Sequence, residues 1–256
     1  MKRGKTVDFT IILIWPIVAS LLSFLFKANF IVATLLFLVL PSIYISLRDK
    51  KSVARAAIFS LAAMPFLFVL EYFAVKSGAW YFTKTIFSTR IFDTIIPEVL
   101  LWYFFWVYLV IIYYEYFIDY DKHPKLYGHK LKYPFFIFIA LVISTIFLAI
   151  YKVSVSIPYF YLIIGIIMAV IPVALALFDF PKLFTKFTKV TIYFFYLYLV
   201  IDLTEIALGH WIYPGKFIGW FEMFGQKLPV EELFAWIILG AAALLSWYEL
   251  FDDDKK

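Results

Sequence analysis

The sequence predicts an all-α integral membrane protein of about eight transmembrane helices, arranged as two parallel four-helix repeats. The first observation is composition: 65% of the 256 residues are hydrophobic and the mean hydropathy is +0.93, whereas a soluble domain is apolar at roughly half of its positions. The second is a series of apolar stretches of about 20 residues, the length of a helix that crosses a bilayer. The third is a set of landmark residues in the first half that recurs at one constant spacing in the second half.

Eight stretches are long and apolar enough to span a membrane. The first two are separated only by Lys27 and Ala28, so we expect a tight turn between them. The basic N-terminus precedes the first stretch, and no small-residue cleavage site follows it, so we interpret this stretch as a retained helix rather than a cleaved signal peptide. The predicted spans are 7–26, 29–47, 56–75, 95–118, 133–151, 157–178, 190–208 and 229–250.

The distribution of Lys and Arg predicts the orientation of the chain. If the N-terminus is cytoplasmic, the inner segments hold sixteen of these residues and the outer segments hold seven. Because cytoplasmic loops carry the excess of positive charge, both termini are expected inside a cell membrane that the chain crosses many times. The two longest connections, 76–94 and 209–228, then lie outside. The net charge of +5 reflects this topology more than binding to nucleic acid.

A repeat is indicated by residue types that coincide when the chain is shifted so that Pro41 falls on Pro172, a shift that we call the repeat offset. One inserted residue then brings Pro97 onto Pro229, so the repeats are 1–128 and 129–256, joined by a short polar loop at 119–132. The coinciding pairs are Pro41 and Pro172, Arg55 and Lys186, Glu71 and Asp202, Gly78 and Gly209, and Trp80 and Trp211. An even number of spans per repeat gives the two copies the same orientation, with an axis along the membrane normal.

Carboxylates inside the predicted spans are candidates for function, because a charge in the bilayer is costly. All of them lie toward the outer ends of their helices. Acids that follow a proline at the start of a helix are also favourable for the helix dipole alone, but this reading does not cover the acids at 202 and 205. The candidates are Glu71, Glu98, Asp202, Glu205, Glu231 and Glu232.

The acids of the seventh span are expected to meet those of the eighth. Asp202 and Glu205 are three residues apart and share a helix face, from which they can reach Glu231 or Glu232. Carboxyl groups clustered in an apolar surround can hold a proton at neutral pH. His210 is a further candidate for this cluster. By contrast, Glu115 and Glu249 and the terminal run 252–254 are interpreted as interfacial charges.

Aromatic residues make up 23% of the chain, which is more than interfacial belts require. The rings either line an interior site for a greasy or cationic ligand or fill the space between closely packed helices. The chain has no cysteine, three dispersed histidines and nine glycines without a phosphate-loop pattern. A metal site, a nucleotide site and any other cofactor are therefore not expected.

In the second half, Asp202 is followed by the segment Gly209-His210-Trp211-Ile212-Tyr213-Pro214 and then by Pro229-Val230-Glu231-Glu232 before an aromatic helix. This pattern resembles that of the lycopene cyclase domain family of archaea, some bacteria and fungi. That family is built of two tandem copies of a membrane domain, which agrees with the predicted repeat. The first half departs from the pattern, because Pro97-Glu98-Val99-Leu100 lacks the paired acids. Either Glu98 substitutes after a shift of one residue, or the first half is degenerate.

The resemblance implies a redox-neutral cyclisation of the linear ends of lycopene to β-ionone-type rings. A carboxylic acid protonates the terminal double bond, a neighbouring double bond closes the ring, and a base removes a proton. Glu231 or Glu232 would be the donor and Asp202 or Glu205 the partner or base, with Glu71 and Glu98 as their first-half counterparts. Candidates for contact with the substrate are Trp211, Tyr213, Phe234, Trp236, Trp80 and Trp102. The carotenoid would come from the lipid bilayer, without a cofactor, and other carotenoid-pathway enzymes are potential partners.

Other readings of the same features remain open. A carotenoid hydratase, or a related isoprenoid-modifying enzyme, would also be a cofactor-free polytopic enzyme that acts on acyclic carotenoid ends. A proton-coupled transporter would use the acids as coupling groups, which are expected near the middle of the bilayer. A non-catalytic pigment-binding protein would use only the aromatic interior.

Overall fold

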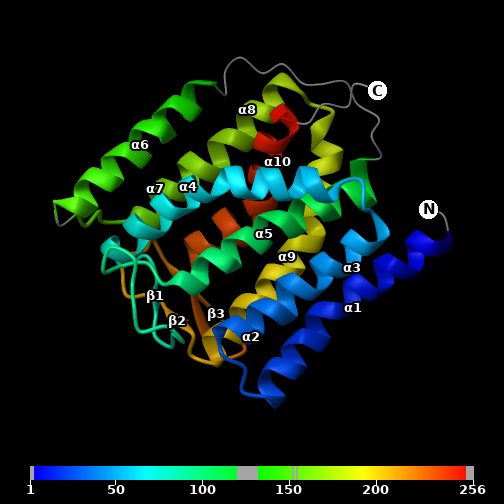
Figure 1. Cartoon of the computed structure of the whole chain (residues 1–256), viewed down its shortest axis with the longest axis horizontal. Helices are drawn as coiled ribbons and strands as arrows, with labels where there is room; N and C mark the ends of the chain where they lie inside the picture. Colours follow the sequence, from blue (N-terminus) through cyan, green and yellow to red (C-terminus); the bar gives the residue numbers. More distant parts are fainter. Residues whose placement is uncertain (1–2, 120–131, 152, 154, 252–256) are drawn as a thin grey trace.

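The computed structural model describes residues 3–119, 132–151, 153 and 155–251. Within these ranges the protein is all-α apart from two small two-stranded sheets (Figure 1). The α-helices are α1 (Arg3–Leu25), α2 (Phe30–Thr34), α3 (Leu40–Arg48), α4 (Val53–Ser77), α5 (Pro97–Tyr114), α6 (Lys132–Ile150), α7 (Phe160–Gly165), α8 (Ile171–Asp179), α9 (Leu183–Ala207) and α10 (Gly240–Phe251). The π-helical segments are η1 (Leu35–Val39), η2 (Glu115–Asp119), η4 (Ile166–Val170) and η5 (Glu232–Ile238), and the strands are β1 (Tyr81–Phe82), β2 (Trp211–Ile212), β3 (Trp220–Met223) and β4 (Gln226–Pro229).

Among the described residues, six helical rods are long and apolar enough to cross a membrane. A seventh is formed by η5 and α10 if they count as one span, although they meet at an angle of 46°. The six rods are Gly4–Leu25, Phe30–Arg48, Val53–Ser77, Pro97–Asp119, Phe160–Asp179 and Leu183–Ala207. These long apolar helices indicate a multi-pass membrane protein.

The eighth predicted span, 133–151, corresponds to α6. Its apolar helix within the described residues, Ile139–Ile150, is shorter than a bilayer crossing. The structure therefore supports six or seven spans, and the eighth stays a prediction. The linker at 119–132 and the boundary between 128 and 129 lie almost wholly outside the described residues.

The outer faces of the helices carry large apolar side chains. Leu21 of α1 is 64% exposed and Ile192 of α9 is 66% exposed. Such surfaces are unfavourable in water and are favourable against lipid chains. The pattern agrees with the composition, in which apolar residues exceed what one core can bury.

Two of the rods contain a π-helical segment just before a proline. Pro41 lies two residues after η1, and Pro172 lies two residues after η4. Proline has no N–H to donate within the helix, and its ring crowds the preceding turn. A widened π turn at this place lets the rod continue through the proline.

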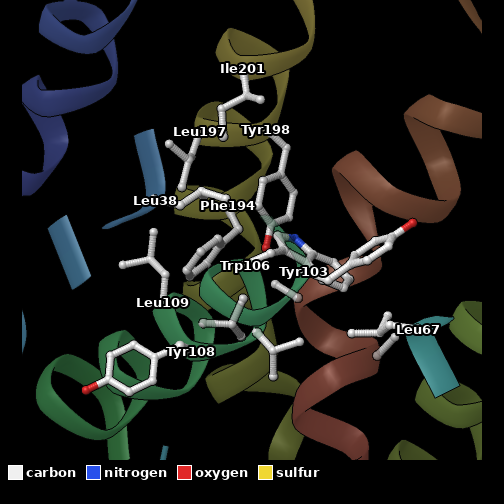
Figure 2. Packing of buried hydrophobic residues seen from close by; sticks show 14 of the residues in the cluster. Leu38, Leu67, Tyr103, Trp106, Tyr108, Leu109, Phe194, Leu197, Tyr198 and Ile201 are labelled. Atoms are coloured by element: carbon white, nitrogen blue, oxygen red, sulfur yellow. The ribbon is translucent and has the colours of Figure 1, made fainter. Parts of the chain in front are cut away.

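Helix α5 lies near the middle of the molecule, with α6 and α1 at opposite edges (Figure 1). It packs along α4, while α1 packs on α9 and α6 packs on α4. Figure 2 shows the core between α5 and α9, where the rings of Trp106 and Tyr198 lie 6.0 Å apart. Aromatic side chains of α5 and α9 thus contact each other in a core that also contains many aliphatic residues.

The two longest connections meet at one end of the helices. Strand β1 follows α4 and pairs antiparallel with β2, which follows α9, with Tyr81 opposite Ile212 and Phe82 opposite Trp211. Strands β3 and β4 form a hairpin in the second connection. The connections 76–94 and 209–228 therefore lie on the same side of the molecule. Two connections that face the same side of a membrane are expected to do so.

Candidate functional site

An aromatic cavity lies beneath the paired connections, between α5, α9 and η5. Its volume is about 80 Å³, which is smaller than the roughly 300–1,000 Å³ typical of small-molecule sites. Two of its sixteen lining residues are acids, Asp202 and Glu232, and three are aliphatic. The other eleven are aromatic: Phe30, Trp80, Phe82, Trp102, Tyr103, Trp106, Tyr161, Tyr198, Trp211, Tyr213 and Trp236.

Glu232 is held by two tyrosine hydroxyl groups. It is the first residue of η5, and only 7% of it is exposed. Tyr161 and Tyr213 both donate to the same carboxylate oxygen, Oε2, and the Tyr213 bond is 3.0 Å long. The Nε1 of Trp211 in turn donates to the Tyr213 hydroxyl over 3.2 Å. Since an indole N–H can only donate, the Tyr213 hydrogen must point to Glu232.

Tyr213 is protonated in this setting. It lies in the connection between α9 and η5, where burial raises its pKa well above the ordinary value and the nearby Glu232 raises the pKa further. The phenol therefore stays a hydrogen-bond donor at neutral pH.

Asp202 completes an acid pair with Glu232. Its side chain projects from α9 in the last turns of the helix, is 6% exposed and lines the same cavity as Glu232, and its Oδ2 has no hydrogen-bond partner among the described residues. Two neighbouring carboxyl groups in an apolar surround do not readily ionise together, so one of them tends to keep a proton. Because Oε2 of Glu232 already accepts from two phenols, the arrangement suits Glu232 as the carboxylate and Asp202 as the acid.

Glu71 stands behind the cavity wall. It is fully buried in α4, and its Oε2 accepts 2.9 Å hydrogen bonds from Trp80 Nε1 and from the Tyr103 hydroxyl. Both of these rings line the cavity, and Glu71 does not. Glu71 is thus separated from the acid pair by its own hydrogen-bond partners.

Glu205 faces away from the cavity, toward His210. The two side chains are buried and paired through Nδ1 of the histidine, whose Nε2 lies 2.9 Å from the carbonyl oxygen of Ala28. A carbonyl oxygen can only accept, so Nε2 carries a hydrogen. The pair ties the second connection to the turn between α1 and α2, and His210 joins Glu205 rather than the acids of the cavity.

Glu98 and Glu231 bind backbone amides of the two connections. Glu98 Oε1 accepts from the N–H groups of Ile86 and Phe87 at 2.7 and 2.9 Å, and Glu231 Oε1 accepts from Ile218 at 2.7 Å. Neither acid lines the cavity. Each fixes a loop to the start of the helix that follows it.

Five of the six aromatic residues predicted to contact a substrate line the cavity, namely Trp80, Trp102, Trp211, Tyr213 and Trp236. Phe234 does not line it. A Cβ built at Gly165 would meet the Phe234 ring at 3.7 Å, so this ring lies against α7. Residues two apart on a helix diverge, so Phe234 and Trp236 point to different neighbours.

Several lining residues are not singled out by the sequence. Tyr161 is the most important of them, because it binds Glu232 directly. It is one of nineteen tyrosines, and no motif surrounds it. Its one signal is position, since the repeat offset places it on Phe30, which lines the same cavity.

The acids at the other end of the helices are also buried. Glu115 and Glu249 are each 5% exposed. Arg55 lies 3.4 Å from Glu115, and Lys186 lies 3.3 Å from Glu249 and also contacts Asp119. Glu115 and Glu249, which were predicted to be interfacial, are thus enclosed in an ion-pair network between helices, and the run 252–254 lies outside the described residues.

Within the described ranges, no group of three or more His, Cys, Asp or Glu side chains is arranged to hold a metal ion. Comparison with protein-family models, with curated proteins and with solved structures finds no match to this chain. The resemblance to the lycopene cyclase domain family therefore rests on the motif residues alone.

Proposed function

We propose that the protein is a membrane enzyme that cyclises the ends of a linear carotenoid, as a lycopene cyclase does. The observation that carries this proposal is the acid pair Asp202–Glu232, which lies in a cavity walled by eleven aromatic rings. Proton-initiated cyclisation needs a protonated carboxyl group, a second carboxylate and ring faces that stabilise a cation. The cavity offers all three.

In the proposed reaction Asp202 gives its proton to the terminal double bond. A C–H bond forms there and a tertiary cation is left, which a neighbouring double bond attacks to close a six-membered ring. Glu232 then takes a ring proton, and a double bond forms in the ring. Glu232 then releases that proton to solvent and Asp202 takes up another, which restores the site, so no electrons are gained or lost.

The motif leaves open which acid donates the proton and which acts as the base. The motif alone favours Glu231 or Glu232 as the proton donor. The two phenol hydrogen bonds to Glu232 favour the carboxylate form of that residue and leave the proton on Asp202. Glu231 is occupied with a loop amide, so it is proposed as a structural residue.

The indole rings are proposed to stabilise the cation. Trp80 and Trp211 are buried, with exposures of 8% and 7%, and both line the cavity. A cation over such a face gains about 0.5–2 kcal/mol, and more where water is excluded. A hydrocarbon substrate would reach this site from the lipid, which suits the apolar outer surface.

We also infer that the chain is two copies of one four-helix unit, and that both copies cross the membrane in the same direction. In support of this, η1 and η4 coincide at the repeat offset, and each precedes a proline. The first helix of each half packs on the third rod of the other, α1 on α9 and α6 on α4. The pairing of β1 with β2 is the one that a two-fold axis between them would produce. With the charge distribution, eight spans and both termini on the cytoplasmic side are the proposed topology, with the cavity toward the outer side.

A test is expression in a bacterium that accumulates lycopene, with pigments resolved by chromatography. The proposal expects ring-bearing carotenoids with the mass of lycopene. A product heavier by one water would support the hydratase instead, and lycopene that copurifies unchanged would support pigment binding. Unchanged lycopene in cells that contain well-folded protein would overturn the cyclase.

Variants locate the activity within this assay. Asp202→Asn and Glu232→Gln are each expected to abolish conversion, because each removes one half of the acid pair. Glu231→Gln is the matched control, since it has the same chemistry at the adjacent position. Equal loss in Glu231→Gln and Glu232→Gln would contradict the assignment.

A further inference from the structure

The two faces of the cavity have matching contacts but different chemistry. Tyr161 packs on Trp80 with ring centroids 5.1 Å apart, and Phe30 packs on Trp211 at 6.1 Å. The repeat offset places Phe30 on Tyr161 and Trp80 on Trp211, so the two contacts correspond to each other. Tyr161 thus occupies on one face the position that Phe30 occupies on the other.

The next ring on each face repeats the difference. Tyr161 lies 6.5 Å from Tyr213, and Phe30 lies 5.1 Å from Phe82. These pairs also coincide at the repeat offset. Two hydroxyl groups on one face are therefore two ring C–H groups on the other.

The acid follows the same rule. Glu98 and Glu231 each accept a hydrogen bond from a backbone N–H of the preceding connection, so they are structural counterparts. Their alignment needs one more inserted residue than the alignment of Pro97 with Pro229. The residue after each lines the cavity, and it is Val99 on one face and Glu232 on the other. The carboxylate that the tyrosines bind thus has an apolar counterpart.

One face therefore carries a carboxylate with its two phenols, and the other replaces all three groups with hydrocarbon. Phe30, Phe82 and Val99 are 1%, 6% and 1% exposed, and their side chains offer no hydrogen bond. We call these three residues the apolar face. A polar group placed against it would lose its bonds to water without gaining new ones.

We propose that the apolar face binds the terminal hydrocarbon of the substrate and selects ends that carry no oxygen, while the opposite face performs the chemistry. This inference rests on the proposed function for the identity of the ligand as a linear polyene. A hydrophobic wall discriminates against an added hydroxyl by about 10- to 100-fold. The cavity is then a site with one reactive face, although its outline comes from both halves.

The test measures which of two ligands the protein retains. Purified Asp202→Asn protein, which does not turn over, is incubated with equal amounts of lycopene and of lycopene hydroxylated at its ends. The protein is isolated again by size exclusion, and its bound pigment is resolved by chromatography. Lycopene is expected in at least about tenfold excess.

Substitutions then place the selectivity on the apolar face. Val99→Thr and Phe82→Tyr each add one hydroxyl with little change in shape, and each is expected to bring the ratio of bound pigments to within about twofold of one. Val7→Thr and Phe184→Tyr make the same changes on exposed outer positions, 54% and 62% exposed, and are expected to keep the excess. A ratio that neither cavity substitution changes, or no bound pigment at all, would overturn the inference.

The outcome is separable from that of the proposed function. Selective retention that depends on Val99 and Phe82, together with no cyclised product from the unsubstituted protein, would keep the apolar face and overturn the cyclase. If the unsubstituted protein cyclises lycopene but the ratio of bound pigments does not respond to the Val99 and Phe82 substitutions, the cyclase is kept and the role of the apolar face is overturned.

Discussion

The hydroxyl group of Tyr161 tests whether hydrogen bonding keeps Glu232 in its carboxylate form. Tyr161 is 2% exposed, lines the cavity and donates to Glu232 Oε2. Tyr161→Phe removes this donor and keeps the ring. The fold already accommodates phenylalanine at the position related by the repeat offset, Phe30, so the variant is expected to fold.

The magnitude follows from the type of bond. A hydrogen bond to a charged group contributes about 1.5–3 kcal/mol, and each step of about 1.36 kcal/mol changes a rate tenfold. If the bond stabilises the carboxylate form of Glu232 during the reaction, Tyr161→Phe lowers kcat by about 10- to 150-fold. KM should stay within about threefold, because a hydrocarbon makes no hydrogen bond to the phenol.

The assay is conversion of lycopene in proteoliposomes as a function of its concentration in the lipid. Tyr159→Phe is the matched control. It also removes a tyrosine hydroxyl, but from a side chain that is 45% exposed and lies two residues earlier in the chain. It should leave both constants unchanged. An unaltered kcat in Tyr161→Phe, or a loss confined to KM, would refute the role of the phenol in positioning the charge.

Three further substitutions test the frame that holds the site. His210→Ala leaves Glu205 buried without its partner, so the thermal midpoint of the detergent-solubilised protein should fall by several degrees, as a loss of about 1–3 kcal/mol implies; an unchanged midpoint would show that the pair is not structural. Gly215→Ala places a Cβ 2.5 Å from the carbonyl oxygen of Gly78, so the same assay should show destabilisation of similar size, and full stability would mean that the backbones separate freely. Glu231→Gln keeps an oxygen that can accept the loop N–H, so conversion should stay within about twofold of wild type, and a complete loss would place Glu231 in the chemistry.

Much of the fold could be predicted from apolar run lengths. The stretches 7–26, 29–47 and 56–75 correspond closely to Gly4–Leu25, Phe30–Arg48 and Val53–Ser77, because a bilayer demands a fixed length of apolar helix. The bend between η5 and α10 was not predicted. It arises where a π-helical segment ends, and the hydrogen-bond pattern that widens a turn has no counterpart in hydropathy.

The candidate site could be predicted only in part. Asp202 and Glu232 stand out because charged groups are rare in apolar helices. Which of two adjacent acids enters the cavity could not be predicted, since the partner of Glu231 is the amide of Ile218, in the loop before it. Glu205 was expected to share the face of Asp202. Its carboxylate instead pairs with His210 in the connection that follows α9.

The central claim is that Asp202 and Glu232 deliver and remove protons during ring closure. Its most direct test is conversion of lycopene by the purified protein in D₂O, with the products weighed by mass spectrometry. Because the acid exchanges with solvent, each ring should carry one deuterium in place of one hydrogen, so the product should gain one mass unit per ring. Rings that form without deuterium, or a product that gains the mass of water instead, would contradict the account.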